Sequence, residues 1–353
     1  MTTTTTKIEQ SYAILESLRM KNHLYLASSS ADYSFIWLRD SFYEVLPYLY
    51  RSGDHYEETY HAILDILNNY SWKFNAHTMR KPQYPYEYIH PRYTADGKEV
   101  FEEWGNCQHD AIGAILYGIA MGEKAGKNIL RNEKDVDTIQ NIIWYLDTCR
   151  YWEDPDNGMW EAGREIHLSS LGACVAGLSE IKDIVLVPNA LIEKGLDAIG
   201  NLFPNESASK AFDLAQLSLI YPYNVLNDNN ARHIVDQIEK QLLRRSGVIR
   251  YKGDSYYASD RSDDRSKGFG YYFGKEAEWT FGLPWLALCY MQFGDYHKAK
   301  MYLDWTEEKM LEDGRLPELY FAGSDDYNKN CPLGWSNAMY ILAKEAYDGT
   351  DED

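Results

Sequence analysis

The sequence predicts an all-α protein, and more specifically an (α/α)6 barrel, a toroid of six helical hairpins. Apolar residues recur at helical spacing in roughly a dozen segments, while strand-like alternation is scarce. Short gaps such as 52–55 join successive segments, as expected for antiparallel helical pairs. About twelve helices paired by short turns suit six hairpins arranged in a ring.

Each predicted helix is a run in which apolar residues fall on one face at a period of 3.6 residues. In chain order, the expected spans are 7–19, 33–51, 55–71, 106–125, 133–149, 168–182, 187–203, 207–216, 227–244, 279–294, 296–311 and 335–347. The best strand candidate is the short run 247–251, which lies inside a long gap.

Three long gaps interrupt the helical pattern, at 72–105, 245–278 and 312–334, and all are rich in Tyr, Trp, Arg, Asp and Glu. Long aromatic and charged loops on a helical scaffold are where a functional site is expected. Neither a Gly/Ser-rich nor a Pro-rich linker divides the chain, so residues 1–353 are expected to form a single catalytic domain.

Charge and composition limit the classes of molecule that the protein is expected to bind. The 35 Lys and Arg residues against 54 Asp and Glu residues give a net charge of −19, which disfavours nucleic acid and anionic membranes. The N-terminus lacks signal-peptide features, and no apolar run approaches the ~20 residues of a membrane span, so a soluble, cytoplasmic protein is expected. Five scattered cysteines without CxxC spacing or metal-spaced His predict reduced thiols, no metal and no cofactor.

Aromatic and acidic residues cluster in seven short motifs. They are WLRDS at 37–41, EEWGNCQHD at 102–110, GMWEAGR at 158–164, IRYKGDSYY at 249–257, KEAEW at 275–279, GRLPELY at 314–320 and PLGWSNA at 332–338. Carboxyl groups beside indoles suit acid/base chemistry on a sugar, because one acid can be kept protonated while flat rings stack on the substrate. A small carbohydrate is therefore the expected partner.

Taken in order, the motifs resemble those of glucoamylase-like glycoside hydrolases, family 15. These are inverting α-glucosidic enzymes with an (α/α)6 barrel, to which the helical domain of phosphorylase kinase regulatory subunits is related. The resemblance runs from about Trp37 to about Leu342. It implies that Glu161 is the general acid and Glu318 the general base.

The same resemblance implies the substrate-binding residues. Arg39 and Asp40 would hold hydroxyls of the terminal glucose, Gln108 would lie near the sugar, and Arg250 would contact it with support from Asp254.

Four tryptophans and one arginine complete the candidates for substrate binding: Trp37, Trp104, Trp160, Trp335 and Arg164. Trp160 is expected to raise the pKa of Glu161. By the resemblance, Trp104 packs beside this acid, while Trp104 and Trp335 suit a hydrophobic core and a sugar platform equally well. Glu276 and Glu278 suit either support of a substrate-binding arginine or solvation.

Prokaryotic members of the resembling family carry an N-terminal β-sandwich ahead of the barrel, and this chain is expected to lack one. The favoured function is exo-acting hydrolysis that releases glucose from the non-reducing end of small soluble saccharides. The main alternative is a non-catalytic or regulatory barrel that binds a glucoside, and a second is a sugar lyase or isomerase. An inverting mechanism predicts carboxyl groups about 6.5–9.5 Å apart.

Overall fold

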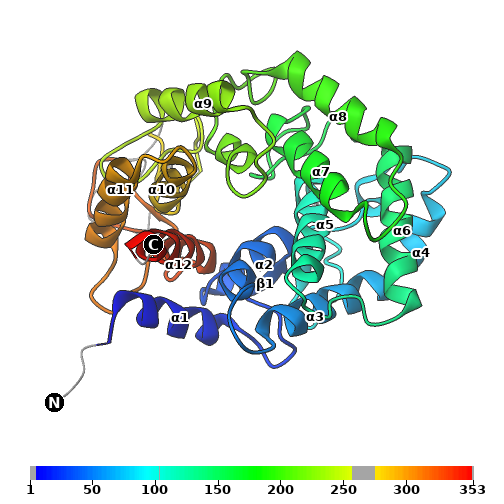
Figure 1. Cartoon of the computed structure of the whole chain (residues 1–353), viewed down its shortest axis with the longest axis horizontal. Coiled ribbons are helices and arrows are strands. Elements are labelled where there is room, and N and C mark those ends of the chain that lie inside the picture. Colours follow the sequence, from blue (N-terminus) through cyan, green and yellow to red (C-terminus); the bar gives the residue numbers. More distant parts are fainter. Residues whose placement is uncertain (1–4, 103, 257–274, 352–353) are drawn as a thin grey trace.

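A closed ring of helices surrounds the barrel axis in the computed structural model, which describes residues 5–102, 104–256 and 275–351 (Figure 1). The inner elements are α2 (Leu38–Val45), α5 (His109–Lys124), α7 (Leu168–Ile181), η4 (Leu214–Leu219), α10 (Gly282–Gln292) and α12 (Gly334–Asp348). Each contacts the next, and α12 returns to α2. This order confirms the predicted (α/α)6 barrel.

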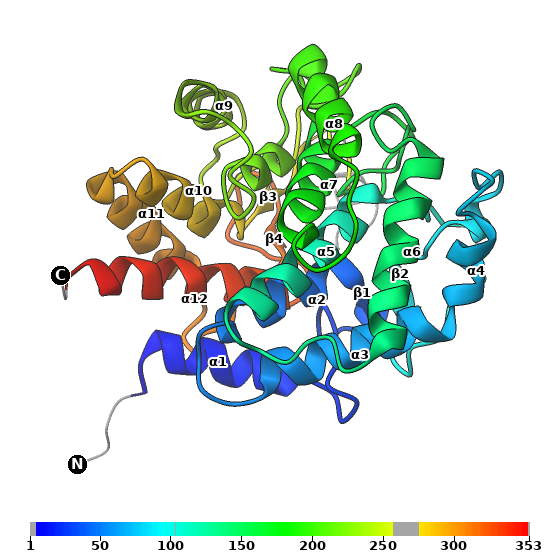
Figure 2. The same cartoon turned by 45° about the vertical axis from the view of Figure 1, so that its right-hand side comes forward.

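The outer helices each pack on the ring from outside, as Figures 1 and 2 show. They are α1 (Lys7–Leu18), α3 (His55–Asn69), α6 (Glu133–Cys149), α8 (Asn189–Leu202), α9 (Asp228–Gln241) and α11 (Tyr296–Lys309), and the short α4 (Ser71–Ala76) packs on α6. They bury one face only, whereas inner helices such as α7 are buried almost throughout. This difference in burial explains their amphipathic sequences.

Two glycines allow α5 and α7 to pack closely. A Cβ atom on Gly113 would lie 2.4 Å from the backbone carbonyl carbon of Ala173, and one on Gly177 would lie 2.5 Å from the Gly113 oxygen. Because real Cβ atoms do not approach backbone this closely, larger residues would force the two helices apart. The site described below is attached to the N-termini of these helices.

The structure corrects three expected elements. The segment 33–51 does not form one helix: β1 (Phe35–Trp37) precedes α2 and pairs with β2 (Arg92–Thr94). Residues 207–213 are not helical, and a 3-10 helix, η4, begins after Asp213, whose side chain caps the Ala215 amide. The run 247–251 makes only isolated bridges, including Val248 to Trp279.

The strands β3 (Glu278–Trp279) and β4 (Leu319–Tyr320) pair antiparallel beside the barrel axis. All five cysteines are buried and unpaired, as predicted. Of the helices in the described part of the chain, none combines the length and apolar character that a bilayer crossing requires.

Candidate active site

One cavity of about 160 Å³ gathers most of the residues that the motifs predicted. Its predicted lining residues are Trp37, Arg39, Asp40, Trp104, Trp160, Glu161, Arg250, Glu318 and Trp335. They come from β1, the start of α2, the loop before α5, the loop between α6 and α7, the loop after α9, and the segments around β4 and α12. Barrel closure therefore brings together motifs that are far apart in sequence.

Glu161 lies on a tight turn between α6 and α7. Its φ of 57° is in the left-handed region, which is uncommon for a residue with a side chain, and its amide donates to the Gly158 oxygen at 3.2 Å. Trp37 Nε1 and Gln108 Nε2 donate to Glu161 Oε1 at 2.9 and 3.2 Å. A left-handed residue at a cavity wall indicates a functional constraint, because surrounding contacts must hold it there.

Glu318 is held differently. Its side chain is only 1% exposed, and three side-chain donors reach it: Tyr33 Oη at 2.5 Å, Asn328 Nδ2 at 2.5 Å and Asn330 Nδ2 at 2.7 Å. Burial raises the pKa of this carboxyl, while the hydrogen bonds from Tyr33, Asn330 and Asn328 oppose the rise. The result is a rigid carboxyl group whose pKa is above its ordinary value.

Arg39 and Asp40 begin α2 and play different parts. Arg39 Nη1 donates to Asp110 at 2.8 Å and to Gln108 Oε1 at 3.0 Å, so the guanidinium is fixed at the cavity wall. Its Nη2 lies 4.0 Å from Glu161 Oε1. Burial raises the pKa of Asp40 to about 7, Arg39 lowers it, and the negative charges of Glu161 and Glu318 add to the rise. Three carboxyl groups therefore share one cavity.

Aromatic rings form one wall of the cavity. Phe281 and Trp335 stack at 4.7 Å with an interplanar angle of 2°, and Trp160 stacks against Trp335 at 6.2 Å. Trp335 is only 4% exposed and also stacks on Tyr43, so it belongs both to the core and to the cavity lining. A flat wall of this kind suits the C–H face of a sugar ring.

Trp160 does not donate its indole hydrogen to Glu161, although the two are adjacent in sequence. Its Nε1 instead donates to the buried Asp213 at 2.6 Å, whereas the indole that donates to Glu161 belongs to Trp37. Arg250 lies 4.6 Å from the Trp279 ring and pairs with both oxygens of Asp254, at 2.7 and 2.8 Å. Asp254 thus supports Arg250 from outside the cavity lining.

Two of the remaining predicted residues stand behind the lining or away from it. Gln108 contacts Glu161 and Arg39 without lining the cavity. Arg164 points elsewhere: its guanidinium donates to Asp154 at 3.1 Å and to the Pro155 oxygen at 2.7 Å. The structure therefore offers no support for Arg164 as a substrate contact, and the turn at Glu161 explains why.

The two acidic residues of the KEAEW motif make structural contacts. Glu278 is buried and accepts from the Ser246 amide at 2.6 Å and the Gly323 amide at 2.7 Å. Glu276 accepts from the Gly253 amide at 3.1 Å. Both tie neighbouring loops together, outside the cavity lining. Glu103 and Tyr257, which belong to two of the other motifs, lie outside the described residues.

Sequence reasoning missed several residues at the cavity. Tyr33 was placed inside a predicted helix, yet it lines the cavity and donates to Glu318. Asn328 and Asn330 were not predicted, although both are buried amides that follow Glu318 by ten and twelve residues. Arg92 also lines the cavity, 3.7 Å from the Trp104 ring, because β2 pairs it with Trp37.

The structure also brings together a buried Cys107, His109 and Asp154, whose ligand atoms lie within 4.8 Å of one another. The sequence spacing predicted no metal ligands among the cysteines and histidines. Lys81 and Arg164 pair with Asp154 at 2.8 and 3.1 Å, so two cations already occupy the surroundings of this cluster. Bound cations would be repelled by those charges, and the group is better described as a buried hydrogen-bonded cluster.

A six-hairpin barrel whose cavity holds carboxyl groups and stacked aromatic rings defines the class of glucoamylase-like barrels. The chain belongs to the family described as Glycosyl hydrolases family 15, which matches residues 23–350. The predicted family resemblance is therefore confirmed.

The curated relatives are subunits of a kinase. The chain is 26% identical over 339 residues to a probable phosphorylase b kinase regulatory subunit alpha of Caenorhabditis elegans, covering 82% of this chain and 27% of that one. The liver isoform of the alpha subunit in Mus musculus is 24% identical, with 92% and 31% covered. The chain thus spans about a quarter to a third of the length of these relatives.

Solved structures share the fold at low identity. A structure described as a wild-type glycosidase superposes with a TM-score of 0.82 at 18% identity, covering 97% of this chain and 96% of that one. The glucoamylase from Saccharomycopsis fibuligera gives 0.69 at 14% identity, with 98% and 94% covered. At such identities, the likeness shows the fold alone.

Proposed function

We propose that this protein is an inverting, exo-acting α-glucosidic hydrolase that releases glucose from the non-reducing end of small soluble saccharides. The observation that carries the proposal is the pairing of Glu161 and Glu318 in one cavity with contrasting environments. Inverting hydrolysis needs two such carboxyl groups, one to protonate the leaving oxygen and one to activate water.

Glu161 is the proposed proton donor. Among the described residues, both of its side-chain hydrogen bonds end on Oε1, which leaves Oε2 to meet a glycosidic oxygen. In the reaction, Glu161 gives its proton to that oxygen as the bond to the anomeric carbon breaks. Its side chain is 19% exposed, which suits contact with a leaving group that enters from solvent.

Glu318 is the proposed general base. It removes a proton from the water that attacks the anomeric carbon on the opposite face, so the product has inverted configuration. The three donors from Tyr33, Asn328 and Asn330 fix the carboxylate in one orientation, which positions the water before the reaction begins.

Asp40 and the aromatic wall are the proposed recognition elements. A carboxylate at the cavity accepts hydrogen bonds from sugar hydroxyls, each worth roughly 1.5–3 kcal/mol when one partner is charged. The aromatic lining, which includes Trp335 and Phe281, offers apolar surface to a sugar ring. A cavity of about 160 Å³ suits one terminal sugar rather than a long chain. The five reduced cysteines fit a cytoplasmic setting.

The second candidate is a regulatory barrel that binds a glucoside without cleaving it, and the likeness to kinase regulatory subunits favours it. Incubation with maltose, isomaltose and trehalose, followed by assay of free glucose, separates the two. The proposal expects glucose from at least one disaccharide and none after Glu161→Gln. Tight binding of 1-deoxynojirimycin without any glucose release would favour the regulatory barrel.

A further inference from the structure

Behind the cavity, a buried network holds the turn that carries Glu161. Asp156 lies five residues before Glu161, is 1% exposed, and pairs its backbone with Glu165 at 2.8 and 2.9 Å. These two hydrogen bonds close the base of the loop. Whatever fixes Asp156 therefore fixes one end of the turn.

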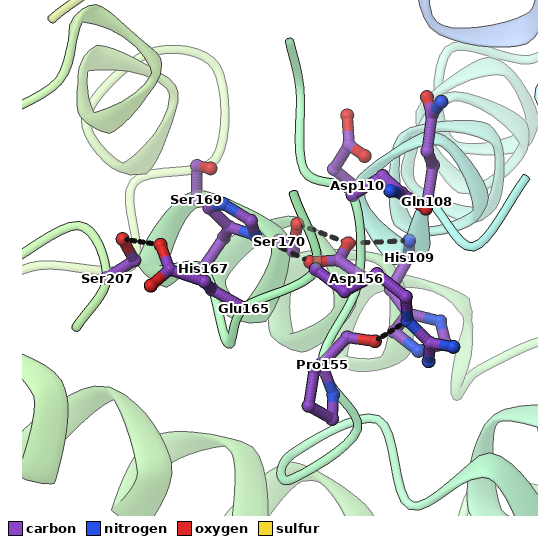
Figure 3. A network of polar contacts seen from close by, with 12 residues as sticks. Gln108, His109, Asp110, Pro155, Asp156, Glu165, His167, Ser169, Ser170 and Ser207 are labelled. Carbon is purple, nitrogen blue, oxygen red and sulfur yellow. Dashed lines mark hydrogen bonds and ion pairs between the residues drawn. The ribbon is translucent and has the colours of Figure 1, made fainter. Parts of the chain in front are cut away.

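The Asp156 carboxyl binds to two inner helices at once, as Figure 3 shows. Its Oδ2 accepts from the His109 amide at 3.0 Å, at the start of α5, and from Ser170 Oγ at 2.7 Å on α7. Its Oδ1 accepts from Nδ1 of His167, which caps α7, at 2.8 Å. One buried carboxyl thus joins the loop base to the two helices.

Three consecutive residues before and at the start of α5 each attach to the loop. The Cys107 oxygen accepts from the Asn157 amide at 2.6 Å, Gln108 donates to Glu161, and the His109 amide donates to Asp156. Asn157 in turn closes the turn, because its Nδ2 donates to the Ala162 oxygen at 2.7 Å. Glu161 is therefore held in register with α5 at several points.

His167 adds charge to this attachment. Burial disfavours its charged form, but the hydrogen bond and charge of Asp156, together with Glu206, raise the pKa of His167 to about 9, against the nearby Lys210. The pKa of Asp156, which forms an ion pair with His167, is lowered despite burial, because His167 stabilises the charged carboxylate. The His167 ring also packs on Gly158 within the turn, where a Cβ atom would lie 2.9 Å away.

We propose that Asp156 is a positioning residue for Glu161. Through its ion pair with His167 and its hydrogen bond to the start of α5, Asp156 orients the proton donor Glu161 toward the leaving group. This inference rests on the proposed function. Within the described part of the chain, the hydrogen-bond partners of Asp156 are His109, His167, Ser170 and Glu165, which do not line the cavity, so its effect on Glu161 must pass through the turn.

The test compares Asp156→Asn on two substrates: the disaccharide that wild type cleaves best, and α-glucosyl fluoride, whose leaving group needs little protonation. We expect kcat on the disaccharide to fall about 100-fold with KM within about threefold, and the fluoride to lose less than about tenfold. The matched control is Glu165→Gln in the same loop, whose side chain bonds Ser207 and Ser209 instead. Its rates should stay within about threefold on both substrates.

Equal losses on both substrates in a folded Asp156→Asn variant, or no loss, would overturn the proposal. If Asp156→Asn does not fold, Ser170→Ala replaces it as the test, because it removes one hydrogen-bond donor to Asp156. We expect kcat to fall about three- to tenfold on the disaccharide alone. If wild type cleaves neither substrate, the proposed function fails. A crystal structure of Asp156→Asn then tests separately whether Asp156 positions Glu161. Glu161 should then leave Trp37 Nε1 in Asp156→Asn, and an intact bond at 2.9 Å would contradict the inference.

Discussion

Glu161 and Glu318 face the same cavity but are held in opposite ways. Glu161 sits on a turn in a left-handed conformation with two donors on one oxygen, whereas Glu318 is buried, with donors on both oxygens. A general acid must follow the leaving group, while a general base must hold one water in line. The difference in attachment therefore matches the difference in proposed role.

The largest effect should follow removal of the base. Glu318→Gln keeps the shape of the side chain but cannot take a proton, so kcat should fall by about 10³–10⁴-fold on every substrate, including α-glucosyl fluoride. Steady-state kinetics on both substrates would check this. As a control, Glu278→Gln alters a buried carboxyl outside the cavity lining and should cost stability but keep kcat within about threefold.

Loss of the acid should be smaller and selective. Glu161→Gln should lower kcat on a disaccharide by about 10²–10³-fold, because the sugar leaving group needs a proton, and should lower the rate on the fluoride by less than about tenfold. The comparison of the two substrates is the measurement. Equal losses on both would mean that Glu161 is not the proton donor and that the contrast with Glu318 has another cause.

The effect of Asp40→Asn should be smaller than that of either glutamate substitution. Asp40→Asn removes a charged acceptor for sugar hydroxyls, worth roughly 1.5–3 kcal/mol, so kcat/KM should fall by about 10- to 150-fold. Thermal unfolding should show an intact fold, since the Asp40 carboxyl faces the cavity. A variant with near-normal activity, or one that does not fold, would remove Asp40 from the recognition site.

The smallest effect tests how Glu318 is tuned. Tyr33→Phe deletes a hydrogen-bond donor that lowers the pKa of Glu318, so this pKa should rise further. A lost hydrogen bond that stabilises the charged form by roughly 1.4 kcal/mol corresponds to a rise of about one pH unit. The base works only when ionised, so activity appears as pH rises through this pKa. The acidic limb of the kcat/KM profile should therefore move to higher pH in the variant. A shift to lower pH, or none, would contradict the assignment of this limb to Glu318.

The barrel and most of the cavity lining could be predicted from the sequence. The helices follow an apolar periodicity, and each motif combines residue types that suit one kind of chemistry. Helical periodicity located the inner and outer helices, and the Trp, Arg and acidic motifs located Glu161, Glu318, Asp40 and Arg250. The separation of the two carboxyl groups stays a prediction, since barrel closure and not local sequence sets it.

The misses have physical causes. The role of Tyr33 was not predicted because β1 and α2 together form one apolar run in the sequence. Only the pairing of β1 with β2 separates the strand from the helix. Arg164 was expected to contact the substrate, but its guanidinium binds Asp154 and the Pro155 oxygen, partners that residue type alone does not reveal. Asn328 and Asn330 acquire their role only from burial beside Glu318, a tertiary property.

The stereochemistry of the first product tests the two-carboxyl account most directly. Proton NMR of an α-glucoside reaction, recorded before mutarotation equilibrates the anomers, should show β-glucose first, because a water activated by Glu318 attacks opposite to the oxygen protonated by Glu161. Glu318→Gln should abolish that signal. Initial release of α-glucose would contradict the inverting pair, even if the protein cleaves glucosides.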